Sequence, residues 1–101
     1  MQFIVLAFDA EDAKALQRRY DARDAHLEKV KECAEAGSQL MGAAIINDNG
    51  DMHGSLMIFD FPTRQDLDMW LEQEPYIKGN VWDKIQVMNC KVAPIFASVT
   101  S

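Results

Sequence analysis

The sequence has little positive charge and no long apolar run. Its 101 residues include 10 Lys and Arg against 16 Asp and Glu, which gives a net charge of -6 at pH 7. Such a chain repels phosphate backbones and offers them no basic stripe, so no nucleic acid is expected as a partner. It also lacks a membrane-spanning stretch and the features of a cleavable leader. We therefore expect no membrane partner and a cytoplasmic location.

Cysteine is scarce as well. Cys33 and Cys90 lie far apart, without a Cys-x-x-Cys spacing or a neighbouring His. This pattern gives no reason to expect a metal site, and it favours two reduced thiols over a disulfide. No cofactor is expected.

What the chain does contain is typical of one globular domain. Apolar residues make up 49% of the sequence and charged residues 26%, which is enough to form a core. We expect a single domain over residues 1–97 and a flexible tail over 98–101.

Four stretches have the length and composition of strands. Residues 2–9 and 54–61 are apolar at both alternating sets of positions, which predicts central strands. Residues 38–46 form a third candidate, joined to the stretch 54–61 as a hairpin by a turn at Asn49-Gly50. Residues 84–92 predict an edge strand.

The helices are predicted from 3.6-residue periodicity and end signals. A short piece over 12–20 is followed by a helix over 22–36, capped by Asp21 and ended by Gly37. Arg18 and Arg19 suit the end of the first piece, where the helix dipole favours cations. Another helix starts with Thr63 as its N-cap and runs to Glu74.

The order strand, helix, strand, strand, helix, strand predicts an α+β ferredoxin-like fold with a four-stranded antiparallel sheet. Two helices can cover only one face of such a sheet. The apolar side chains of the central strands on the other face also need a cover. We therefore predict a homodimer through the open sheet face.

His26 is the candidate for chemistry. It lies at the border of the predicted buried stripe of its helix, and Glu74 is predicted at the end of the other helix, where a carboxylate favours a cationic partner. The two helices pack side by side, so His26 or Arg23 can meet Glu74. One interpretation is a proton-transfer pair; the other is a structural His bonded to a backbone carbonyl, beside an Arg23–Glu74 ion pair.

Several short motifs in a fixed order resemble the YciI-like (YCII-related) family. These are Arg23-x-x-His26-Leu27, Gly37, Gly42, Gly54, Trp70, Glu74-Pro75-Tyr76 and Gly79. The resemblance spans nearly the whole chain. It implies a dimeric α/β barrel of two ferredoxin-like subunits, with an active site around a His–Asp pair. In this chain Glu74 replaces the family aspartate, which moves the carboxylate by one methylene.

The resemblance also implies a small-molecule ligand, because family members include a dehydrochlorinase that acts on a chlorinated hydroxyquinol. The hypothesis is proton transfer of the lyase or isomerase type on a small cyclic or aromatic compound. His26 would be the acid or base, Glu74 would orient it, Arg23 would bind an oxyanion, and Trp70 and Tyr76 would line the pocket. The alternative is a non-catalytic module that binds a small ligand or a protein.

Overall fold

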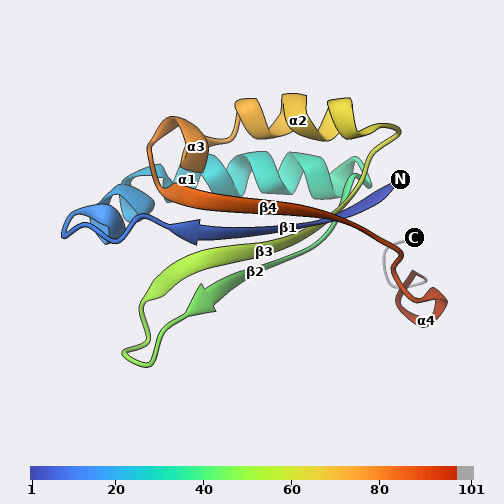
Figure 1. Ribbon diagram of the computed structural model, residues 1–101. Helices are drawn as coiled ribbons and strands as arrows, with labels where there is room; N and C mark the ends of the chain where they lie inside the picture. The colour runs from blue at the N-terminus through green and yellow to red at the C-terminus, as the bar shows by residue number, and fades with distance from the viewer. Residues whose placement is uncertain (98–101) are drawn as a thin grey trace.

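The computed structural model describes residues 1–97, and it contains one four-stranded antiparallel sheet (Figure 1). Its elements are β1 (Gln2–Asp9), α1 (Ala15–Glu35), β2 (Gln39–Ile46), β3 (Met52–Asp60), α2 (Arg64–Glu72), α3 (Pro75–Lys78), β4 (Trp82–Cys90) and α4 (Pro94–Ala97). The strand order is β2-β3-β1-β4, so the predicted ferredoxin-like fold is confirmed. The predicted tail, 98–101, lies outside the described residues.

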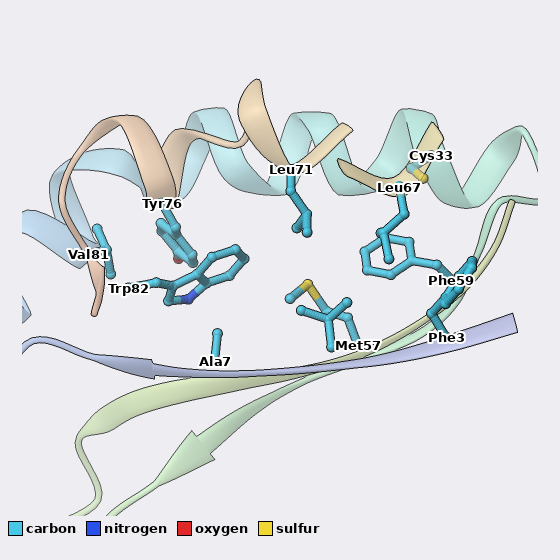
Figure 2. Packing of buried hydrophobic residues seen from close by; sticks show 11 residues of the cluster. Phe3, Ala7, Cys33, Met57, Phe59, Leu67, Leu71, Tyr76, Val81 and Trp82 are labelled. Carbon is cyan, nitrogen blue, oxygen red and sulfur yellow. The ribbon is translucent and has the colours of Figure 1, made fainter. Parts of the chain in front are cut away.

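The two strands predicted to be central are central. In β1 the side chains of Phe3, Val5 and Ala7 are fully buried under the helices. Phe3 pairs with Phe59 and Val5 with Met57 on β3, and these residues form the floor of the core (Figure 2). Helices α1, α2 and α3 cover this face of the sheet, whereas α4 lies on the other side (Figure 1). In the described part of the chain, no helix combines the length and apolarity needed to span a bilayer.

Helix α1 corrects the prediction of two helices with a boundary at Asp21. The structure has one helix from Ala15 to Glu35. Asp21 is exposed and accepts a hydrogen bond from Gln17 Nε2 at 2.8 Å, a contact between neighbouring turns that stabilises the continuing helix. The predicted end is correct, because Gly37 follows with φ of +80°.

The buried face of α1 is also unusual. It consists of Ala15, Arg19, His26 and Cys33, so two of its four members are polar. Leu27, next to His26 in the sequence, is 46% exposed. Helix α1 therefore points polar side chains toward the sheet, and this positions the candidate site.

The second predicted helix begins as expected and ends earlier. Thr63 Oγ1 accepts a hydrogen bond from the backbone N–H of Asp66 at 3.1 Å, which confirms the N-cap. However, α2 ends at Glu72, and Glu74 is the N-cap of the next helix, α3. The predicted position of Glu74 at a helix C-terminus was therefore wrong, because Pro75 starts a new helix as well as ending the old one.

The face of the sheet away from α1 and α2 carries apolar side chains. Phe8 is 38% exposed and Met88 is 41% exposed, and Met88 pairs with Ile4, which is half-buried. Strand β4 was predicted over 84–92 and instead spans Trp82–Cys90. Cys33 and Cys90 are both free thiols, as predicted.

Candidate active site

His26 and Glu74 are in direct contact. The Nδ1 atom of His26 lies 2.7 Å from Oε1 of Glu74, and the side chain of Glu74 is completely buried. The same Oε1 accepts a hydrogen bond from the backbone N–H of Tyr76 at 3.2 Å. When Glu74 is a carboxylate it can only accept, so the hydrogen of this bond belongs to Nδ1 of His26. In a neutral imidazole the lone pair is then on Nε2.

Tyr76 packs between two polar side chains of α1. Its ring stacks on the imidazole of His26, with ring centroids 3.9 Å apart and an interplanar angle of 13°. The guanidinium carbon of Arg19 lies 4.7 Å from the centroid of the same ring. Arg19 and His26 are two helical turns apart on one face of α1, which leaves room for one ring between them. Burial raises the pKa of the Tyr76 phenol, although Arg19 and Arg23 oppose this, so the phenol stays protonated at neutral pH.

Arg19 belongs to a buried polar network. Its Nη1 donates to both carboxylate oxygens of Asp9 at 2.8 and 3.1 Å, and its Nη2 donates to Ser55 Oγ at 3.0 Å. Trp82 Nε1 also donates to Ser55 Oγ, at 3.3 Å. Burial raises the pKa of Asp9, and the attraction of Arg19 partly offsets this effect. The network links β1, α1, β3 and β4 beside the stacked rings.

A cavity of about 230 Å³ lies between α1 and the β2–β3 half of the sheet. In Figure 1 the β2–β3 hairpin curls away from α1 at this end of the molecule. The wall contains Arg19, Arg23, His26, Leu27, Val30, Gln39, Gly42, Ala43, Ala44, Met52, Ser55, Met57 and Tyr76. Within residues 1–97, Nε2 of His26 has no hydrogen-bond partner. With Nδ1 bonded to Glu74, Nε2 is the ring nitrogen that remains for a ligand in this cavity.

The structure places the predicted site residues as follows. His26, Arg23 and Tyr76 line the cavity, and Glu74 lies behind His26. Trp70 is not part of the wall. It packs on Phe59, with ring centroids 4.7 Å apart, and below the ammonium group of Lys29. Phe59 lies at the opposite end of the core from Tyr76 and Trp82 (Figure 2), so Trp70 packs away from His26.

The alternative structural interpretation required an Arg23–Glu74 ion pair. Among residues 1–97, no such ion pair is formed, and Glu74 contacts His26 instead. The Oε2 atom of Glu74 is buried and has no hydrogen-bond partner in the described chain. Nor do three His, Cys, Asp or Glu side chains of this part converge as ligands for a metal ion.

Sequence reasoning missed Arg19 and Ser55. Arg19 was interpreted as a cation at a helix end, because the predicted break at Asp21 placed it there. Its separation of seven residues from His26 was the available signal, since residues seven apart share a helix face. Ser55 lies in a mainly apolar strand and had no sequence signal of its own.

The chain as a whole is similar to known proteins. A sequence profile described as YCII-related domain matches residues 1–91. Protein YciI of Escherichia coli O6:H1 is 28% identical over 93 residues, which cover 86% of this chain and 93% of that protein. Protein YciI of Shigella flexneri matches with the same identity and coverage.

Solved structures share the fold. The 5-chloro-2-hydroxyhydroquinone dehydrochlorinase TftG of Burkholderia phenoliruptrix AC1100, in complex with 2,5-dihydroxybenzoquinone, matches with a TM-score of 0.79 and 22% identity, over 92% of this chain and 96% of that one. A dimeric ferredoxin-like protein of unknown function from Jannaschia sp. CCS1 matches with a TM-score of 0.50 and 15% identity, over 90% and 98% of the two chains. At these identities the likeness shows a common fold.

Proposed function

This chain belongs to the YCII-related family, and we propose that it is an enzyme that uses His26 to move a proton on a small cyclic or aromatic compound. One observation carries this proposal: the His26–Glu74 hydrogen bond of 2.7 Å stands at the wall of a cavity that can hold a small ring. A His whose Nδ1–H is bonded to a carboxylate has a fixed tautomer, and its Nε2 can take a proton near neutral pH.

The roles of the other residues follow from their positions. Glu74 would hold the imidazole and stabilise its protonated form, as a buried carboxylate does in a catalytic pair. Arg23 is exposed at the cavity wall and would attract an anionic group of the substrate. The ring of Tyr76 would keep the imidazole in place by stacking.

The reaction type that we favour is an elimination. TftG, a structural neighbour, is a dehydrochlorinase that was solved with 2,5-dihydroxybenzoquinone. In a dehydrochlorination Nε2 would take a proton from the substrate and chloride would leave with its bonding electrons. The substrate loses HCl overall, so the step needs no oxidant or reductant.

A non-catalytic module is the second candidate. Oε1 of Glu74 also binds the backbone N–H of Tyr76, so the His26–Glu74 pair ties α1 to α3. If the His26–Glu74 pair only ties the two helices together, the protein would bind a ring compound without converting it.

An assay of chloride release from 5-chloro-2-hydroxyhydroquinone distinguishes the enzyme from the binding module. We expect the wild-type protein to release chloride and His26→Ala to lose this activity. His53→Ala is the matched control, because His53 lies outside this cavity, in a separate depression beside Phe8. Binding of 2,5-dihydroxybenzoquinone without any chloride release would favour the binding module.

We also propose that two copies of the chain pair through the open sheet face. The support is the exposed apolar side chains of Phe8 and Met88 on the side of the sheet away from α1, α2 and α3. Apolar patches of this kind on a soluble protein usually mark an interface. The neighbour from Jannaschia is a dimeric protein of the same fold.

A further inference from the structure

Ser55 is a hydroxyl group at the cavity wall that the proposed proton transfer does not use. It lies on β3, on the helix-facing side of the sheet, and is almost fully buried. Its neighbours in register are Ala7 on β1 and Ala44 on β2. Because both neighbours are small, the hydroxyl is not covered by adjacent side chains of the sheet.

The hydroxyl group of Ser55 can form one more hydrogen bond, as a donor. A hydroxyl group has two acceptor lone pairs and one O–H donor. Both lone pairs are used, because Oγ accepts from Arg19 Nη2 at 3.0 Å and from Trp82 Nε1 at 3.3 Å. No group within residues 1–97 accepts a hydrogen bond from this O–H. Ser55 is therefore a donor that still lacks an acceptor.

The two groups that bond to Ser55 cannot exchange roles with it. Arginine and the indole N–H of tryptophan are donors only, so the Ser55 hydroxyl cannot turn its hydrogen toward either of them. Arg19 is held in place by both oxygens of Asp9 and by the ring of Tyr76. The O–H of Ser55 therefore points away from both Arg19 and Trp82. The nearby guanidinium charge makes this O–H a stronger donor.

We propose that Ser55 is a ligand-binding residue, which donates a hydrogen bond to an ionised or carbonyl oxygen on the ring compound that His26 acts on. This inference rests on the proposed function and narrows its substrate class. The ligand would bridge two walls of the cavity, with its reacting proton near His26 on α1 and an oxygen at Ser55 on β3. Rings that carry phenolate or quinone oxygens meet this requirement, whereas rings without an acceptor oxygen do not.

The test is calorimetric binding of two probes to the wild type and to Ser55→Ala. The first probe is 2,5-dihydroxybenzoquinone, whose acidic hydroxyls ionise in water; the second is hydroquinone, a ring of similar size with neutral hydroxyls. A hydrogen bond to a charged group contributes about 1.5–3 kcal/mol, so the dissociation constant for the first probe should rise by about 10-fold to 100-fold in Ser55→Ala. The preference for the ionised probe should shrink by a similar factor.

Two further variants guard against a loss of folding. Ser55→Thr keeps the hydroxyl and should bind 2,5-dihydroxybenzoquinone within a few-fold of the wild type. Ser38→Ala, between α1 and β2 and outside the cavity wall, is the matched control and should bind normally. Circular dichroism of each variant checks that the sheet is intact.

Each other outcome contradicts the role of Ser55. If Ser55→Ala binds both probes as the wild type does, the hydroxyl makes no contact with the ligand, and the proton-transfer role of His26 is unaffected. An equal loss for both probes would show that Ser55 only supports the fold. If the wild type binds neither probe and releases no chloride, the proposed function fails first, and the inference fails with it.

Discussion

The imidazole of His26 and the carboxylate of Glu74 meet at 2.7 Å although 48 residues separate them in the chain. One oxygen of Glu74 serves two purposes, because it binds His26 and caps the first turn of α3 through the N–H of Tyr76. The cap fixes the carboxylate, and the carboxylate fixes the tautomer of the histidine. Pro75, at the first position of α3, sets the backbone direction that makes both contacts possible.

Glu74→Gln should remove catalysis and keep the fold. The amide oxygen can still accept from His26 and from the N–H of Tyr76, but the negative charge that stabilises a protonated imidazole is lost. We expect the rate of chloride release to fall by about 10²-fold to 10⁴-fold. The free energy of unfolding in urea should change by about 1 kcal/mol or less.

The matched control is Glu72→Gln, an exposed residue at the end of α2. It removes the same charge two residues away and should leave the rate unchanged. An unchanged rate in Glu74→Gln would show that the buried carboxylate has only a structural role.

The sequence predicts that His26 and Glu74 are neighbours, but it does not predict the helix that holds Glu74 in place. The fold follows from the order of the periodic segments, and it brings the middle of α1 beside α3, the segment that follows α2. The four-residue helix α3 has no periodicity to detect. Glu74 was therefore interpreted as a residue at a helix C-terminus, although it is an N-cap. The Arg19 contacts were missed because a charged residue on a buried helix face runs against binary patterning.

Asp9→Asn should destabilise the protein strongly. The pKa of Asp9 is raised by burial, so this carboxylate makes the fold less stable as pH rises above its unfolded value of 3.8. Nevertheless, its removal leaves the guanidinium of Arg19 buried without a counter-charge, which costs about 3–5 kcal/mol. Urea unfolding at pH 7 measures the loss.

A double variant separates the two effects. In Asp9→Asn/Arg19→Met the unpaired charge is gone, and a good part of the lost stability should return. If the double variant were as unstable as the sum of the two single variants, the ion pair would not be the cause.

Gly54→Ala should be damaging, because the added Cβ would lie 2.8 Å from the backbone oxygen of Ala7 on the paired strand. The backbone must shift to relieve this contact, at a cost of about 1–3 kcal/mol. Gly42→Ala is the matched control, since its Cβ would meet only the flexible end of Gln39, at 3.0 Å. Thermal unfolding of the two variants compares them, and equal losses would contradict the backbone explanation.

The thiol of Cys33 should react slowly. Burial raises its pKa from 9.0 to about 11, so at pH 8 roughly one thiol in a thousand is ionised, against about one in ten for a free cysteine. Cys90→Ser leaves Cys33 as the only thiol, and its alkylation in the folded protein should be about 100-fold slower than in urea. Because the folded pKa is raised, the stabilising effect of the protonated thiol is complete below pH 9 and disappears as the pH rises through about 11. Equal rates in both states would show that the thiol is accessible.

The open sheet face should hold two copies of the chain together. Met88 pairs with Ile4 on this face, and a C2 interface repeats the pair, so each substitution is present twice in the dimer. Met88→Asp would place two unpaired charges in an apolar interface, and we expect the dissociation constant to rise by about 100-fold or more. Light scattering at micromolar concentration should give twice the mass of the chain for the wild type and one chain mass for Met88→Asp.

Met69→Asp is the matched control. Met69 is 57% exposed on α2, on the opposite side of the sheet, and its substitution should leave the dimer intact. A wild type that is monomeric at this concentration would contradict the proposed dimer. It would show that the apolar side chains of β1 and β4 on this face are exposed to water.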